Sequence, residues 1–255
     1  MPEWCGTAHE RITLRMLLAH TAGMQSGADY RTLLDANVAE VALARPLAAS
    51  PGERVIYSDL GFVALGVLVE RVSGTSLATA IDATFARPSL GFSPPGPQRA
   101  AIPATEHDGW RGRVQGVVHD EKAYLMGGSA GHAGLFASAA DVAAMTQAYL
   151  GVRCGRVPRL LPAELAREAT MEAAYDPILR RGLGWALKTT ASNSCGERFG
   201  QTSFGHTGFV GTCVWADPER DVLGVLLTNT VYYGRGDSRG LRAAFYDGIV
   251  ADLEA

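Results

Sequence analysis

Two apolar runs joined by a turn, in the last quarter of the chain, constrain the fold more than any other feature. The first run is Thr212-Cys213-Val214-Trp215-Ala216-Asp217, and the second is Val222-Leu223-Gly224-Val225-Leu226-Leu227. Between them lies Asp217-Pro218-Glu219-Arg220-Asp221, a turn-forming segment. Short apolar runs on both sides of a turn containing proline predict a β-hairpin.

A segment rich in glycine and small residues, Ser203 to Gly211, comes directly before this hairpin. Glycines beside a strand allow backbone N–H groups to approach a bound molecule closely. His206 and Thr207, in the middle of the segment, place an imidazole and a hydroxyl beside such a molecule. The pattern predicts a polar site on a sheet strand. Alone it is a weak signal, because a surface or core histidine is the commoner case.

Length and composition narrow the classes of protein that the chain can represent. With 255 residues, 47% hydrophobic and 19% charged, it can form one globular domain or two lobes with a sizeable core. A net charge of −3 gives no reason to expect nucleic acid or an anionic membrane as a partner. No apolar run reaches the length of a membrane span. The first residues show no signal-peptide pattern, and the compartment, cytoplasmic or periplasmic, stays open.

Helical patterns come first along the chain and strand patterns come late. Residues 91–118 read as a long loop, and residues 184–190 read as a strand. Apolar residues 60–70 predict a long, buried helix. Helical spacing also predicts helices over residues 12–21, 30–44, 140–150, 162–173 and 238–253. This order favours an α+β fold over an alternating, doubly wound one.

Several short motifs occur in one order along the chain. They are Leu17 to Met24 (LLAHTAGM), Pro51 to Asp59 (PGERVIYSD), the glycine-rich Gly127 to Gly134, and His206-Thr207-Gly208. In this order they resemble the class C β-lactamase and penicillin-binding-protein superfamily of serine hydrolases. The resemblance spans nearly the whole chain and implies a serine β-lactamase-like α+β fold, with an antiparallel sheet flanked by helices and a helical lobe. It implies one module over residues 1–255, with a mainly helical lobe at 30–180 and a sheet-containing lobe from 1–29 and 181–255.

The resemblance also assigns roles to individual residues. Tyr57 falls at the motif tyrosine that exchanges protons with the nucleophile and the leaving group, a role that requires nearby cations because its ordinary pKa is near 10. Asp59 falls where the motif most often has asparagine, and its charge would oppose a tyrosinate. His206, Thr207 and Gly208 match the family's Lys-Thr-Gly, with histidine in the lysine position. Thr207 would contact substrate, and Phe209 would lend its N–H to the oxyanion hole.

One departure from the family pattern concerns the nucleophile. The family's serine lies in a Ser-x-x-Lys motif, and this sequence contains none, because the residues three before Lys122 and Lys188 are His119 and Trp185. We therefore expect the N-terminal strands and the nucleophile helix of the family fold to be missing, and the chain to be inactive as written. Without those strands, the segment Val222–Leu227 would be an exposed sheet edge through which the chain self-associates.

The resemblance implies acyl transfer to serine and hydrolysis of an amide, D-amino-acid peptide, lactam or small ester, with no metal or organic cofactor. A catalytically dead module that binds peptides or muropeptides is an alternative. Gly127-Gly128-Ser129-Ala130-Gly131 also fits the G-x-S-x-G nucleophile elbow of α/β-hydrolases, with Ser129 as nucleophile. His119-Asp120-Glu121 with His132 fits no zinc spacing and is expected to be a polar loop.

Overall fold

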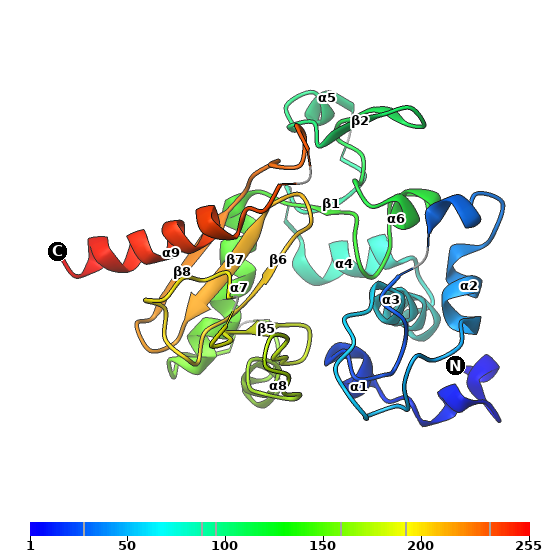
Figure 1. Cartoon of the computed structure of the whole chain (residues 1–255), viewed down its shortest axis with the longest axis horizontal. Coiled ribbons are helices and arrows are strands. Elements are labelled where there is room, and N and C mark those ends of the chain that lie inside the picture. The colour runs from blue at the N-terminus through cyan, green and yellow to red at the C-terminus, as the bar shows by residue number, and fades with distance from the viewer. Residues whose placement is uncertain (28, 88, 95, 159, 192, 235) are drawn as a thin grey trace. The chain divides into compact units, whose positions relative to one another are not determined.

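The computed structural model describes residues 1–27, 29–87, 89–94, 96–158, 160–191, 193–234 and 236–255. The chain divides into two compact units, Met1–Ala137 and Ser138–Ala255. Figure 1 colours the first unit from blue to green and the second from green to red. The second unit combines helices with the late strands, as expected of an α+β chain. The lobes at 30–180 and at 1–29 with 181–255 have other bounds and stay a prediction.

The first unit is mainly helical. Its core lies between α3 and the N-terminal segments, where Trp4, Leu17, Leu43 and Leu60 are buried together. Its helical elements are η1 (Pro2–Trp4), η2 (Ala8–Arg11), α1 (Leu14–Leu18), η3 (Tyr30–Thr32), α2 (Val38–Ala44), α3 (Asp59–Ser73), α4 (Leu77–Phe85), α5 (Gly96–Arg99) and α6 (Glu121–Leu125).

Helix α3 is the central element of this unit, and the residues that flank it determine where it begins and ends. The Ser58 side chain accepts a hydrogen bond from the Gly61 N–H at the start, and Gly74 ends the helix in the left-handed conformation with φ 68°. Leu60, Val63 and Ala64 are buried in the core. Val69 and Val72 are 41% and 81% exposed. Residues 60–68 are buried or partly buried as expected, and the expectation is wrong for Val69 and Glu70 at the end of the predicted range.

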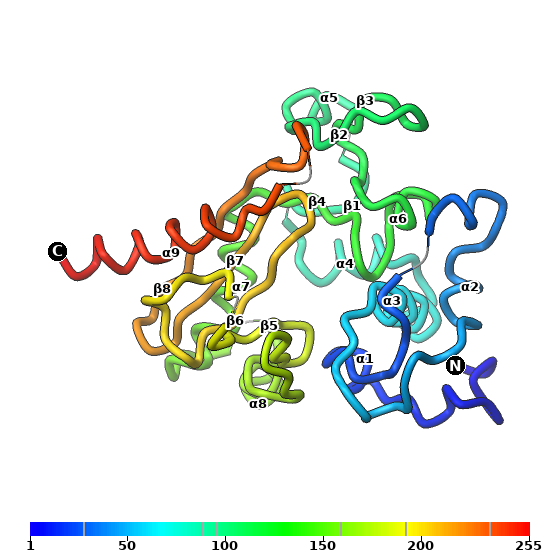
Figure 2. The backbone as a smooth tube through the Cα atoms, viewed as in Figure 1, coloured from blue at the N-terminus to red at the C-terminus, as the bar shows by residue number. Residues whose placement is uncertain are grey.

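Short strands occupy part of residues 91–118, which the sequence predicted to be a loop. β1 (Gly91–Phe92) pairs with β4 (Leu135–Phe136), and β2 (Glu106–Asp108) pairs with β3 (Gly112–Val114), all antiparallel. Figure 2 shows β2 and β3 as a hairpin that returns on itself. Runs of two or three residues are too short to show the alternation by which a strand is recognised in a sequence.

A four-stranded antiparallel sheet forms the centre of the second unit. Its strands lie in the order β5 (Ala186–Leu187), β6 (Phe204–Thr207), β7 (Cys213–Asp217) and β8 (Val222–Leu226), so the predicted hairpin is confirmed as β7–β8. Trp215 lies opposite Gly205 on one side and Gly224 on the other. A Cβ atom at Gly205 would lie 2.5 Å from the Trp215 ring, so the indole requires glycine there.

Helices cover both faces of this sheet. Among the described residues of this unit, the helices are α7 (Ala139–Arg153), α8 (Ala163–Ala169) and α9 (Arg239–Leu253). Val214 and Ala216 pack in one core with Leu150 of α7, whereas Cys213 and Trp215 pack in another with Tyr246 of α9. Successive strand residues point to opposite faces. The alternation therefore places α7 on one face and α9 on the other, as Figure 1 also shows.

The four cysteines are free, and their exposure differs. Cys5 is exposed, Cys154 is partly buried, and Cys195 and Cys213 are buried. Burial raises the pKa of the Cys195 thiol to about 12 and also raises that of Cys213. These two thiols therefore stay protonated at neutral pH and act as small apolar side chains.

Within the described part of the chain, no single helix has the length and apolar character needed to cross a membrane. Among the described helices, α3 and α4, which meet at a bend of 78°, reach that length and composition when they are taken together.

Candidate active site

The motif Tyr57-Ser58-Asp59 lies at the start of α3, where side-chain and backbone hydrogen bonds fix it. The Ser58 hydroxyl accepts from the Gly61 N–H at 3.0 Å and donates to the Gln25 carbonyl oxygen at 2.6 Å. The Asp59 N–H donates to the Ser26 carbonyl oxygen at 3.1 Å. The Tyr57 side chain remains 39% exposed. The motif is thus rigid at its backbone and open at its phenol.

His20 contacts the same motif from the N-terminal side. Its ring centroid lies 4.6 Å from that of Tyr57 and 4.9 Å from that of Phe62. Its Nδ1 accepts a hydrogen bond from the Ser58 N–H at 3.0 Å. His20 therefore braces the segment that leads into α3.

Asp59 belongs to a charged cluster that the sequence analysis did not predict. The Lys122 Nζ lies 3.4 Å from the Asp59 Oδ2 and 2.9 Å from the Asp120 Oδ2. The His132 Nε2 lies 2.8 Å from the Asp120 Oδ1. The Lys122 and His132 side chains are only 10% and 3% exposed. A largely buried network therefore connects the tyrosine motif with α6 and with the glycine-rich loop.

The charges in this cluster support one another. Burial by itself lowers the pKa of Lys122, but the hydrogen bonds and charges of Asp120 and Asp59 outweigh it and raise that pKa. Burial likewise favours protonated Asp120, but the His132 hydrogen bond, with Lys122, holds the pKa of that carboxyl below its usual value. Lys122 and Asp120 are therefore ionised at neutral pH. The Lys122 charge offsets that of Asp59 next to Tyr57.

Within the described residues, the ligand atoms of Asp59, Asp120 and His132 lie within 4.8 Å of one another, close enough to hold a metal ion. His119 and Glu121, which the sequence grouped with this cluster, are not part of the trio. The Lys122 ammonium lies between the two carboxylates and supplies positive charge there.

The glycine-rich loop lacks the geometry of a nucleophile elbow. Ser129 follows helix α6, and the next residues form an isolated bridge between Ala130 and Ala133, although an elbow needs a strand before the serine and a helix after it. The Ser129 Oγ is buried. A Cβ atom at Gly131 would lie 2.0 Å from the Phe62 carbonyl oxygen. The elbow hypothesis is therefore wrong, and the loop is shaped by its close packing on α3.

His206 and Thr207 lie on strand β6, opposite Val214 and Cys213 of β7. The strand ends in a tight turn, in which the Gly208 N–H donates to the Thr212 carbonyl oxygen at 2.7 Å. Phe209 lies in this turn and is 62% exposed. The strand at His206 and Thr207 was predicted, whereas the turn that follows it was not. The roles of His206, Thr207, Gly208 and Phe209 in binding or catalysis stay predictions.

His206 is neutral at physiological pH. Burial, with the nearby charge of Arg181, lowers its pKa to about 4. Its Nδ1 lies 2.9 Å from the Thr207 carbonyl oxygen, which can only accept, so Nδ1 carries the proton and Nε2 is the basic nitrogen. The family pattern has a lysine at this position. In this environment it cannot replace the positive charge of a lysine at pH 7.

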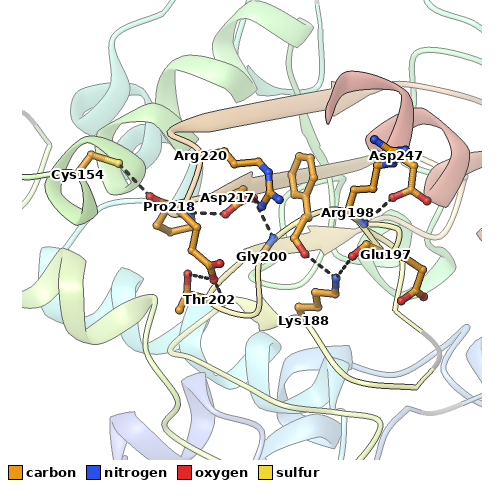
Figure 3. Close-up of polar contacts among 12 residues, drawn as sticks. Cys154, Lys188, Glu197, Arg198, Gly200, Thr202, Asp217, Pro218, Arg220 and Asp247 are labelled. Carbon is orange, nitrogen blue, oxygen red and sulfur yellow. Dashed lines mark hydrogen bonds and ion pairs between the residues drawn. The ribbon is translucent and has the colours of Figure 1, made fainter. Parts of the chain in front are cut away.

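A second polar network holds the segment that leads into β6 (Figure 3). The Lys188 Nζ, in a residue only 2% exposed, donates to the carbonyl oxygens of Glu197 at 2.9 Å and Phe199 at 2.6 Å. The Asp217 carboxylate, fully buried at the end of β7, accepts from the Gly200 N–H at 2.9 Å and from the Arg220 Nη1 at 3.0 Å. These bonds fix the start of β6 and hence the register of His206.

The predicted site residues fall in both units. Tyr57 and Asp59 lie in Met1–Ala137, whereas His206, Thr207, Gly208 and Phe209 lie in Ser138–Ala255. The structure brings together the members of each group. That the two groups form one active site stays a prediction from the resemblance.

Comparison with known proteins identifies the family. The sequence model of the Beta-lactamase family matches residues 2–247. The chain belongs to the Beta-lactamase family. Its α+β fold and its similarity to class C β-lactamases are therefore confirmed.

Two solved structures and one curated relative illustrate the similarity. A class C β-lactamase superposes with a TM-score of 0.70 at 15% identity, covering 98% of this chain and 73% of that one. A D-stereospecific amidohydrolase from Streptomyces sp. gives 0.64 at 20% identity, covering 96% and 77%. The Escherichia coli (strain K12) protein named "Putative D-alanyl-D-alanine carboxypeptidase" is 33% identical over 257 residues, covering 88% of this chain. The chain spans 58% of that relative's length.

Proposed function

We propose that this Beta-lactamase-family chain carries the tyrosine and sheet motifs of a serine hydrolase that acts through an acyl-serine intermediate. The proposed substrates are amides, D-amino-acid peptides, lactams or small esters, and D-amino-acid peptides are favoured by the names of the relatives. The observation that carries the proposal is the pairing of a rigid backbone with an exposed phenol at Tyr57, at the start of the helix where the family motif belongs.

Tyr57 would transfer a proton between the attacking serine hydroxyl and the leaving group. A tyrosine does this only if its phenolate is favoured, and a bare carboxylate at Asp59 would oppose that. The Lys122 ammonium, 3.4 Å from the Asp59 Oδ2, offsets this charge. Asp59 is therefore compatible with a proton-transferring Tyr57, although its carboxylate cannot donate a hydrogen bond to a substrate carbonyl.

The β6 residues would bind the substrate and stabilise the transition state. His206, neutral and basic at Nε2, would act through hydrogen bonding or proton transfer and not as a fixed positive charge. Thr207 would contact the substrate. Gly208 lets the turn after β6 close on Thr212, because a Cβ atom there would collide with the Thr212 hydroxyl. The Phe209 N–H would donate to the developing oxyanion, an interaction that contributes about 3 kcal/mol in serine hydrolases.

Residues 1–255 contain no Ser-x-x-Lys, the motif that carries the nucleophile in the proposed reaction. We therefore expect residues 1–255 alone to form no acyl-enzyme. The test is the intact mass after exposure to a fluorophosphonate and, separately, to a penicillin. The expected result is no adduct, with labelling appearing when a segment bearing Ser-x-x-Lys precedes the chain. An adduct at Ser129 would overturn the assignment.

A catalytically dead binding module is the second candidate, favoured by the presence of Tyr57 and His206 in a sequence without Ser-x-x-Lys. The same experiment separates the two functions. If an added segment bearing Ser-x-x-Lys does not produce labelling, while a D-alanyl-D-alanine peptide binds in calorimetry, the binding module is the better description. Self-association through the edge of the sheet at β8 is a further proposal, because β8 pairs with β7 at the end of the strand order.

A further inference from the structure

His20 has an unusual backbone conformation for a residue with a side chain. It is buried, with 5% of its surface exposed, and its φ of 58° lies in the left-handed region. Glycine is the usual residue there, because a Cβ atom is crowded in this conformation, and asparagine, aspartate and histidine are the side-chain-bearing residues that adopt it most often. Strained residues persist where their surroundings hold them in place, and they concentrate at functional sites.

The left-handed turn directs two acceptors of His20 toward one short segment. Its carbonyl oxygen accepts from the Ile56 N–H at 2.8 Å, and its Nδ1 accepts from the Ser58 N–H at 3.0 Å. Ile56 and Ser58 are the two neighbours of Tyr57. Because Nδ1 is an acceptor, the neutral imidazole carries its proton on Nε2.

We propose that His20 is the positioning residue of Tyr57. It clamps the backbone on both sides of the tyrosine and packs its ring 4.6 Å from the phenol ring. The left-handed φ of His20 is what allows its carbonyl and its imidazole to reach the same segment. His20 matters for catalysis only if Tyr57 has the role proposed above. The order of the Tyr57 backbone and the rate of catalysis are therefore measured separately.

The positional test uses NMR spectroscopy of the 15N-labelled chain. A through-hydrogen-bond 15N–15N coupling between the Ser58 amide and the His20 Nδ1 is expected in the wild type. Two variants accommodate the left-handed φ: His20→Asn retains an acceptor near the Nδ1 position, and His20→Gly has none. The amide order parameter of Tyr57 should be about 0.85 in the wild type and in H20N, and about 0.6 in H20G.

The kinetic test measures kcat and KM for an ester substrate, with a segment bearing Ser-x-x-Lys placed before the chain. H20G should lower kcat about tenfold or more with little change in KM, because a displaced catalytic group reduces the reactive fraction of complexes without weakening binding. H20N should recover most of that loss.

The outcomes separate the two ideas. An absent coupling in the wild type, or an unchanged Tyr57 order parameter in H20G, would overturn the positioning role whatever the activity. If the coupling and order parameters are as expected but Tyr57→Phe leaves ester turnover unchanged, the positioning role stands and the proposed function of Tyr57 fails.

Discussion

Replacement of Lys122 by methionine should destabilise the first unit. The substitution leaves the carboxylates of Asp59 and Asp120 close together without the cation between them, whose side chain is only 10% exposed. Breaking a buried ion pair on one side costs several kcal/mol, and the partial exposure of the two carboxylates reduces this to about 2 kcal/mol. Urea unfolding followed by circular dichroism measures the change in the free energy of unfolding.

The control for Lys122→Met is Arg71→Met. Arg71 pairs with Glu3 at 2.8 Å, but the two side chains are 44% and 36% exposed, so the control should not change the unfolding midpoint measurably. Equal midpoints for the two variants would show that the Lys122 cluster contributes no more than a surface pair.

His206 should make stability depend on pH on the acid side. Its pKa is about 4 in the folded chain, against about 6.5 when unfolded, so the unfolded state binds more protons between these values. The free energy of unfolding should therefore fall as the pH is lowered from about 6.5 to 4, by up to about 3 kcal/mol from this group. In His206→Gln this part of the pH dependence should disappear.

Urea unfolding at a series of pH values measures the effect of His206→Gln. His107→Gln, at an exposed position on β2, controls for the loss of one histidine. If the two variants have the same acid dependence, the shifted pKa of His206 does not contribute to stability.

Local patterns identified the residues of the candidate site but not their partners. Tyr57, Ser58 and His206 were found from short motifs, and the Ser58 cap is a local interaction. The Lys122–Asp59 pair joins residues far apart in the sequence, and no local pattern reports it. One signal was available: the chain has two lysines among 23 basic residues, and both are buried. A rare lysine in an arginine-rich chain is a candidate for an internal ion pair.

At the level of secondary structure, strand β6 should depend on Gly205. A Cβ atom there would lie 2.2 Å from the Val214 carbonyl oxygen and 2.5 Å from the Trp215 ring. Gly205→Ala should force β6 and β7 apart and cost about 2 kcal/mol, a typical cost of overpacking. Thermal unfolding and the chemical shift of the adjacent His206 amide report the change.

The matched substitution is Gly248→Ala in helix α9, where no atom lies within 4 Å of the added Cβ. It should stabilise the chain by about 0.5–1 kcal/mol, because alanine is the better helix former. A destabilised G248A, or a G205A as stable as the wild type, would contradict the packing described for the sheet.

Elements with strong periodicity were predicted closely, and elements defined by long-range contacts were not. Helix α9 was predicted from Ser238 and begins at Arg239, ending at Leu253 as expected. The helix predicted over 162–173 ends at Ala169, and the Thr170 carbonyl oxygen accepts from the Arg153 Nη1 at 2.8 Å. The Thr170 hydroxyl also donates to the Ala166 carbonyl oxygen at 3.0 Å, so a long-range contact from α7 and a local bond meet where the helix ends.

For the whole molecule, the proposed self-association through the β8 edge predicts concentration-dependent assembly. Leu227, directly after β8, is 46% exposed, and a lysine there would disfavour edge-to-edge pairing. Sedimentation velocity over a range of concentrations should show oligomers in the wild type and a shift to monomer in Leu227→Lys. Val157→Lys, at a position 82% exposed outside the sheet, is the control. A monodisperse, cooperatively melting monomer at every concentration would contradict the proposal.

The order of motifs predicted the fold of the whole chain better than composition or periodicity did. Periodicity favoured only an α+β class, whereas the match over residues 2–247 fixes the family. The boundary between the units, at Ala137 and Ser138, lies in the short segment between β4 and α7. Nothing in the composition of that segment marks it as a linker.

The unequal burial of the four cysteines makes one of them suitable for selective labelling. A maleimide reacts with thiolates. Thiolates are scarce at Cys195 and Cys213, because burial raises the pKa of both thiols. Burial, together with the hydrogen bond and charge of Asp221, also raises the pKa of the Cys154 thiol. Cys5 is exposed on the first unit. A fluorophore can therefore be attached at one known position without any engineered substitution.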